Sequence, residues 1–234
     1  SCDVYFYEIS NEIGIDRMHQ YLDAFGLGQK TNIELTGERI GLIPSTKWKQ
    51  TMFKREEDRI WYPGETVIAS IGQGYMLATP LQLANATAAL ATRGKRFQAK
   101  LILATEDPIN KEKKYKNFTQ LDDIEISNQK YWEEVVSAMH NVMQGNGTAQ
   151  NAGLEATYRM AGKSGTVQVI SVGQEEEYDE TLLEERFLDH ALFVAFAPLE
   201  NPKIAVSVIV ENGQSGSRVA APIARAIMDK YLGY

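Results

Sequence analysis

The sequence has little cysteine, no long apolar run and a deficit of positive charge. Cys2 is the one cysteine among 234 residues, so no internal disulfide can form and the redox compartment stays open. No stretch of about 18 or more apolar residues occurs, so this stretch of chain does not span a membrane. Lys and Arg number 24 against 31 Asp and Glu, a formal net charge of −7, which argues against nucleic acid and gives no polybasic signal for a lipid surface.

The rest of the composition is that of an ordinary globular protein. Hydrophobic residues make up 44% and charged residues 24%, and the length favours one domain. The first residue is a serine, and neither an initiator methionine nor a charged-then-apolar leader is present. We therefore expect this chain to be part of a longer protein.

Apolar periodicity predicts helices first, then strands and a closing helix. Spacings of three and four residues predict helices over residues 4–13, 16–25, 79–94, 127–145 and 218–232, with Thr79 and Ser127 as N-caps. The buried sides of three of these helices, at 16–25, 127–145 and 218–232, are expected to hold the following residues: Met18, Tyr21, Leu22, Phe25, Trp132, Val135, Val136, Met139, Val142, Ile223, Ile227, Met228 and Tyr231. Residues 29–75 show no sustained period and are expected to form loops, turns and short strands. Residues 95–126 are polar and irregular, apart from a strand-like stretch over 99–104.

Three short runs have the composition of strands. They are rich in Val, Ile and Phe and cover residues 160–172, 191–197 and 204–210. The short connection between the last two favours an antiparallel hairpin. The order of elements indicates an α/β or α+β layer, in which helices cover an antiparallel sheet.

The most informative segment is Lys163-Ser164-Gly165-Thr166, on the first of these strands. A cation, a hydroxyl and a residue without a side chain follow one another, so this edge can hold a carboxylate and pair with an extended substrate. The same residues also suit an exposed edge strand that uses Lys to prevent pairing with other chains. From the four residues alone, both interpretations stay open.

Several motifs along the chain resemble one family. Residues 161–168 resemble the Lys-Thr/Ser-Gly motif of the penicillin-binding proteins and serine β-lactamases, and Ser1-Cys2-Asp3 resembles their Ser-x-Asn or Ser-x-Asp motif. Further matches follow in family order at 72–75 (Gly-Gln-Gly-Tyr), 78–84 (Ala-Thr-Pro-Leu-Gln-Leu-Ala), 146–149 (Asn-Gly-Thr-Ala) and 219–222 (Val-Ala-Ala-Pro). The resemblance implies that residues 1–234 are the C-terminal portion of a class B transpeptidase domain.

The resemblance also carries expectations about the subfamily and the fold. Residues 14–17, 48–50 and 60–66 most resemble the elongation-specific class B penicillin-binding proteins. The implied architecture is the α/β, penicillin-binding protein and serine β-lactamase-like transpeptidase fold, an antiparallel sheet flanked by helices. Two strands and the nucleophile helix of that fold would lie upstream of this chain. Its own core should then be incomplete and need the upstream part, covalently or as a second chain, to be stable.

The resemblance implies roles for the residues of the Ser-x-Asp segment and for Lys163. Ser1 would relay a proton to the leaving amine while hydrogen-bonded to the cationic Lys163, which biases the site electrostatically. Asp3 would face the peptide stem of the substrate. Many relatives carry Asn at that position, so charge and donor capacity differ here.

The strand residues would bind the other end of the substrate. The hydroxyls of Ser164 and Thr166 would bind the terminal D-Ala carboxylate, and Gly165 would let the stem approach the strand. The N–H of Thr166 would be one of two oxyanion-hole donors. This chemistry requires no cofactor.

The nucleophile of the family is the Ser of a Ser-x-x-Lys motif that precedes Ser-x-Asn, and this sequence begins at the latter. One such string, residues 127–130, occurs here in the wrong order, and an N-cap is the expected role of its Ser127. We therefore predict that this chain alone cannot be acylated.

Cys2 has two interpretations. It is either a small core residue or, as the resemblance to some elongation-class members implies, a ligand of a structural zinc together with upstream Asp and His residues. His19, His140 and His190 share no metal-binding spacing and are expected at the surface or as caps.

The function implied by the resemblance is that of a peptidoglycan D,D-transpeptidase. It would cross-link stem peptides through an acyl-serine intermediate during cell elongation and be inhibited by β-lactams. The implied location is the periplasmic face of the inner membrane, with an N-terminal anchor. The implied partners are a SEDS-family glycan polymerase and other elongation proteins. Two alternatives are kept: a β-lactam sensor or β-lactamase-like hydrolase, and a non-catalytic module that binds stem peptides or partner proteins.

The acidic excess lies in one segment. Residues 175–189 hold eight Asp and Glu against one Arg, so the rest of the chain is formally neutral. This segment is expected to be an insertion between two sheet strands. It is either a solvated loop or an acidic rim that tunes the approach of the amine acceptor or a partner.

Overall fold

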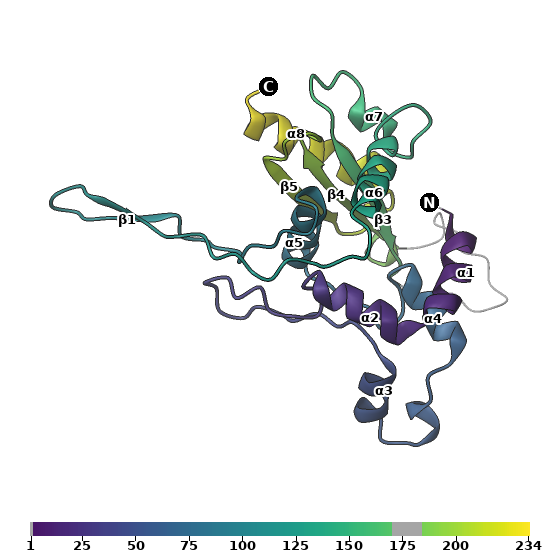
Figure 1. Cartoon of the computed structure of the whole chain (residues 1–234). Coiled ribbons are helices and arrows are strands. Elements are labelled where there is room, and N and C mark those ends of the chain that lie inside the picture. The colour runs from purple at the N-terminus through teal and green to yellow at the C-terminus, as the bar shows by residue number, and fades with distance from the viewer. Residues whose placement is uncertain (1, 170–183) are drawn as a thin grey trace.

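The computed structural model describes residues 2–169 and 184–234 (Figure 1). Its helices are α1 (Asp3–Ile13), α2 (Ile15–Ala24), α3 (Thr46–Met52), α4 (Pro63–Ser70), α5 (Pro80–Ala91), α6 (Lys130–Asn141), α7 (Gln150–Gly153) and α8 (Ala221–Leu232). Its strands are β1 (Ala104–Glu106), β2 (Lys113–Tyr115), β3 (Ala161–Val167), β4 (His190–Ala197) and β5 (Ile204–Val210). Short 3-10 helices are η1 (Glu57–Arg59) and η3 (Glu185–Phe187), and η4 (Gly216–Ala220) is a π-helix.

The main sheet contains β3, β4 and β5 in that order, and all its pairs are antiparallel. Ser164 of β3 lies opposite Phe193 of β4, which lies opposite Val208 of β5. The three predicted strands and the hairpin of the last two are thus confirmed, except that β3 ends at Val167 and residues 170–172 of the first predicted strand lie outside the described residues. Among the described residues, β3 is an edge strand, so one side of it pairs with no other strand.

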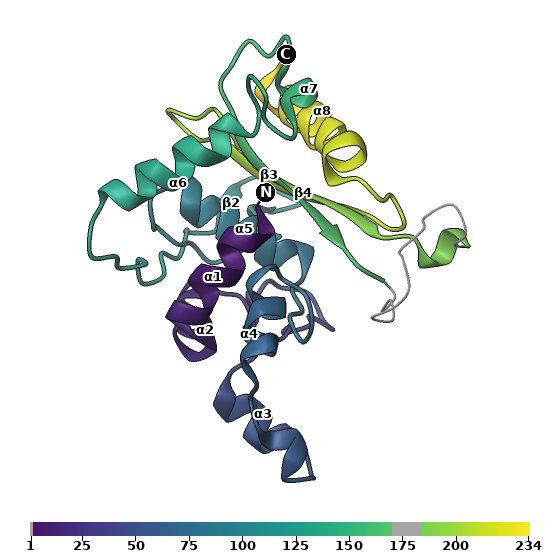
Figure 2. The same cartoon turned by 90° about the vertical axis from the view of Figure 1, so that its right-hand side faces the viewer.

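The core lies on both faces of this sheet, with helices on each side (Figure 2). Side chains alternate between the faces along β4. Phe193 and Ala195 pack with Met228 of α8 in one cluster. Phe196 packs with Val136 and other residues of α5 and α6 in the second cluster. A layer of helices on both faces is the architecture that the sequence predicted.

The start of α5 shows how a local motif organises a distant loop. The hydroxyl of Thr79 accepts the N–H of Gln82 at 3.2 Å, and Gln82 Oε1 accepts the N–H of Thr79 at 2.9 Å. This capping box confirms the N-cap predicted at Thr79. The buried Gln82 amide also donates to the carbonyls of Gln29 and Ile40, which ties the loop after α2 to α5.

Several local predictions are wrong. Residues 46–52 and 63–70 form helices α3 and α4 rather than loops. The predicted strand over 99–104 is replaced by the β1–β2 hairpin, which projects from the body in Figure 1. Ser127 is not an N-cap, because α6 begins at Lys130 and Asn128 Oδ1 accepts the Lys130 N–H at 3.0 Å.

The buried faces of the helices agree with expectation only in part: Trp132, Val136 and Met139 are buried as predicted. Exposed side chains include several that were expected to be buried: Tyr21, Val135, Ile223, Ile227 and Tyr231. In α8, Met228 is buried as predicted, and the other residues that contact the sheet are Ala221 and Ala224. Small residues let the helix backbone approach the sheet closely, so the larger apolar residues on its other side remain in solvent.

The chain leaves an unusually large surface uncovered. Its accessible area is 15338 Å², whereas a compact monomer of 26.2 kDa exposes about 10,600 Å². An accessible area above that of a compact monomer is what an incomplete core would give. The requirement for an upstream part stays a prediction. No helix formed by residues 2–169 or 184–234 is long and apolar enough to cross a bilayer.

Candidate functional site

The N-terminus of α1 and the edge strand β3 approach each other although they lie far apart in the sequence. Asp3 is the first residue of α1, and Lys163 is the third residue of β3. The Asp3 carboxylate is close enough to act on the charge of Lys163. The fold therefore brings together the two segments that carry the predicted site residues.

Lys163 is the partly buried cation of this site. Burial lowers the pKa of its ammonium group, and the negative charge of Asp3 acts in the opposite direction. Its Nζ donates a hydrogen bond to the carbonyl of Ser164 at 2.6 Å. A cation at this position can orient an anionic ligand and bias a nearby hydroxyl.

The strand residues after Lys163 face a loop from the other end of the chain. Thr166 is exposed, and its hydroxyl donates to the carbonyl of Gln214 at 3.5 Å. Gly216 packs directly on the strands, because a Cβ at that position would lie 2.5 Å from the carbonyl oxygen of Gly165. The segment between β5 and α8 therefore borders the site, and Gly165 keeps the strand surface free of a side chain there.

Gln73 is a site neighbour to which sequence reasoning assigned no role. Its Nε2 donates to the backbone carbonyl of Thr166 at 3.3 Å. The Gly-Gln-Gly motif was the available signal, but it served only to support the family resemblance. This hydrogen bond attaches the segment after α4 to the end of β3.

A buried lysine holds the segment that carries Gln73. Lys49 Nζ contacts Glu65 Oε1 at 2.5 Å and donates to the carbonyl of Ile60 at 2.7 Å. The aromatic rings of Phe53, Trp61, Tyr62 and Tyr75 lie 5.3–6.0 Å from this ammonium group. We call these residues the Lys49 cage. Since Tyr75 is two residues from Gln73, the cage fixes the loop after α4 against α3.

Of the predicted zinc ligands, Cys2 is the one that lies among the described residues. Cys2 is exposed and precedes α1. Residues 2–169 and 184–234 contain no group of three or more His, Cys, Asp or Glu that could hold a metal ion. His140 is buried rather than at the surface, and its Nδ1 contacts the carbonyl of Met160 at 2.6 Å. Zinc at Cys2 would therefore need ligands from elsewhere and stays a prediction.

Two predictions fall wholly or partly outside the described residues. Ser1, the expected proton relay, lies outside them. Most of the acidic segment 175–189 does as well, and its described end contains η3, where Arg186 pairs with Glu184 at 2.8 Å.

The fold and the approach of the two motifs define a class of protein. The family described as "Penicillin binding protein transpeptidase domain" matches residues 1–229, and the chain belongs to this family. Over 233 residues it is 42% identical to the peptidoglycan D,D-transpeptidase MrdA of Haemophilus influenzae, a match that covers 99% of this chain and 35% of that protein.

Solved structures point to the same group within the family. A crystal structure of Pseudomonas aeruginosa PBP2 in complex with WCK 5153 is 41% identical, with a TM-score of 0.80, and the match covers 98% of this chain and 47% of that one. A complex between PBP2 and MreC from Helicobacter pylori gives 30% identity and a TM-score of 0.79, covering 99% and 39%. The predicted family and fold are thus confirmed. The chain spans about a third of the length of MrdA.

Proposed function

We propose that this chain provides two motifs of a peptidoglycan D,D-transpeptidase site, the Ser-x-Asp segment at residues 1–3 and the Lys-Ser-Gly segment at residues 163–165. The observation that carries the proposal is the approach of Asp3, at the start of α1, to Lys163 on the edge strand β3. The similarity to MrdA over 99% of the chain supports the choice of substrate. The reaction would join stem peptides through an acyl-serine intermediate, and β-lactams would trap that serine.

Each motif residue has a proposed task. Lys163 and Ser1 pass a proton to the leaving amine, and Asp3 faces the stem. The hydroxyls of Ser164 and Thr166 bind the carboxylate of the terminal D-Ala, and Gly165 gives the stem access to the strand. The Thr166 N–H stabilises the developing oxyanion.

The nucleophile is proposed to come from a Ser-x-x-Lys segment upstream of Ser1. Residues 127–130 do not suit the role, because Ser127 is exposed in the segment before α6. Incubation of this chain alone with fluorescent penicillin is therefore expected to give no covalent label. Labelling that disappears in Ser127→Ala would overturn this assignment.

The decisive experiment measures acylation of the full-length protein by fluorescent penicillin. We expect Lys163→Ala to slow acylation at least about hundredfold, because it removes a charge that acts at the reacting atoms. Lys114→Ala is the matched control, since Lys114 is an exposed strand lysine in β2. An acylation rate in Lys163→Ala equal to that of the control contradicts the proposal.

The same preparation separates the alternatives. A transpeptidase is acylated once per molecule and cross-links stem peptides, whereas a β-lactamase-like hydrolase turns over nitrocefin. A sensor is acylated without cross-linking, and a non-catalytic binding module does neither.

The location and partners are part of the proposal. The Helicobacter pylori PBP2 that resembles this chain forms a complex with MreC. We propose a periplasmic position at the inner membrane through an upstream anchor. An MreC-like protein and a SEDS-family glycan polymerase are the proposed partners.

A structural zinc at Cys2 is proposed for the full-length protein. The exposed thiol and a set of upstream carboxylate and imidazole ligands would suit zinc. Metal analysis should find zinc in the wild type and none in Cys2→Ala. Equal, negligible zinc in both would end the idea.

A further inference from the structure

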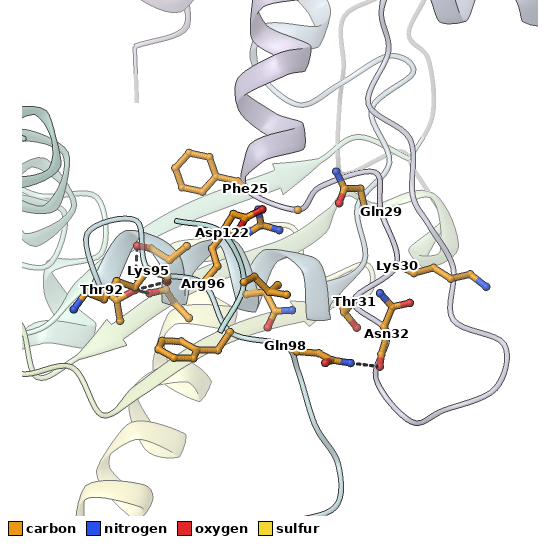
Figure 3. A pocket seen from close by; sticks show the side chains of 16 residues that line it. Phe25, Gln29, Lys30, Thr31, Asn32, Thr92, Lys95, Arg96, Gln98 and Asp122 are labelled. Atoms are coloured by element: carbon orange, nitrogen blue, oxygen red, sulfur yellow. Dashed lines mark hydrogen bonds between the residues drawn. The ribbon is translucent and has the colours of Figure 1, made fainter. Parts of the chain in front are cut away.

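A second polar cavity lies away from the site, between the end of α2, the second half of α5 and the base of the projecting hairpin (Figure 3). Its volume is about 610 Å³, within the roughly 300–1,000 Å³ of small-ligand pockets. None of the predicted site residues lines it, and the proposed reaction gives it no task.

The charge in this cavity is opposite to that of the chain as a whole. Lys30, Lys95 and Arg96 line it, against the single carboxylate of Asp122. The chain itself carries a formal charge of −7. Lys30 and Lys95 lie on opposite sides of the cavity in Figure 3, so the positive charge is distributed along it rather than concentrated at one point.

Arg96 is the central group. It is half-buried, and within the described residues its guanidinium group makes no hydrogen bond or ion pair. Gly26 leaves space for it, since a Cβ built there would lie 3.6 Å from Arg96 Nη2. A partly desolvated guanidinium group without a protein partner is well suited to bind a planar carboxylate through two hydrogen bonds.

The remaining lining suits a peptide. Gln98 Nε2 donates to the carbonyl of Asn32, and Gln29 Nε2 donates to Asp23. Both amide groups are thus oriented, and their oxygens remain as acceptors for peptide N–H groups. The side-chain amide of Asn85 has no protein partner among the described residues. The cavity therefore combines fixed acceptors with three cations.

We propose that this cavity binds a peptide that carries at least two carboxylates. One carboxylate pairs with Arg96, and another pairs with Lys30 or Lys95 at a side of the cavity. The choice of peptide rests on the proposed function: a non-reacting stem peptide of peptidoglycan carries several carboxylates and would be held here while a neighbouring stem reacts.

The test uses the full-length protein and the tripeptide L-Ala-γ-D-Glu-meso-diaminopimelate. This probe lacks D-Ala-D-Ala and cannot act as a donor in the reaction site. Calorimetry should detect saturable binding that persists after the protein has been acylated with penicillin. Arg96→Gln should weaken binding about tenfold. Asn85→Asp should also weaken binding, because the new carboxylate repels those of the peptide while the side-chain volume is kept.

Matched controls isolate the charge and the site. Arg55→Gln makes the same charge change at an exposed side chain outside the cavity and should leave binding unchanged. The tripeptide with its carboxylates amidated should bind at least about tenfold more weakly. Equal affinity in Arg96→Gln, equal affinity of the amidated probe, or loss of binding after acylation would each overturn the proposal. Acylation rates measured on the same variants test the proposed function separately.

Discussion

The Lys49 cage makes a quantitative stability prediction. The side chain of Lys49 is 5% exposed and that of its partner Glu65 is 20% exposed. Lys49→Met keeps most of the volume but removes the cation, which leaves the Glu65 carboxylate and the Ile60 carbonyl without this donor. Removal of one partner from a buried ion pair costs about 3–5 kcal/mol, and the exposure of Glu65 places this pair near 3 kcal/mol.

The assay is thermal unfolding of the full-length protein followed by tryptophan fluorescence. Trp48 and Trp61 both lie at the cage, so the signal reports on this region directly. A loss of about 3 kcal/mol corresponds to a fall in Tm of about 6–12 °C for a domain of this size. A fall of less than about 2 °C would refute the reasoning.

Two controls show whether charge burial is the cause. Arg55→Met breaks an ion pair whose side chains are 77% and 76% exposed, and it should cost less than about 0.5 kcal/mol. The double variant Lys49→Met/Glu65→Gln removes both charges and should be more stable than Lys49→Met alone. If the double variant were the less stable of the two, the uncompensated carboxylate would not be the cause.

Three further predictions concern the site and helix α8. Asp3→Asn should move the alkaline limb of the acylation pH profile to lower pH, since the Asp3 charge raises the pKa of Lys163 against burial; an unmoved limb contradicts this. Gln73→Ala should slow acylation several-fold at unchanged Tm, because the Thr166 carbonyl loses an exposed hydrogen bond; a matching loss of Tm would indicate general destabilisation. Burial raises the pKa of Asp229, but hydrogen bonds from the Tyr158 hydroxyl and the Arg225 guanidinium group outweigh burial and hold that pKa below its usual value. The stability advantage of the wild type over Asp229→Asn in urea should therefore be present near pH 6 and disappear as pH falls below about 3.8; an advantage independent of pH would contradict that origin.

Much of the fold could be predicted because its signals are local. The Thr79 capping box depends on residues three apart, and the strand runs depend on side-chain composition and alternation. The family motifs placed Lys163 and Asp3 in one site before any geometry was available. These interactions are specified by residues close in sequence and do not depend on which distant elements pack over them.

The errors arise where a distant contact decides. Residues 46–70 have no long apolar period, and α3 and α4 form around the charge pair of Lys49 with Glu65. Ile223 and Ile227 looked buried because they are large and apolar, but α8 presents Ala224 to the sheet instead. Periodicity shows that a helix has two sides, whereas the shape of the neighbouring surface selects the side that is buried.

The sequence by itself determined the family, the order of helices and strands, and the residues of the two motifs, because these follow from local preferences and recognisable strings. Only the tertiary structure decided that Gln73 contacts Thr166, that four rings surround Lys49, and that Arg96 faces a cavity without a protein partner. Each of these depends on side chains that come from different elements. Their distances are set by packing of the whole chain, which no local pattern records.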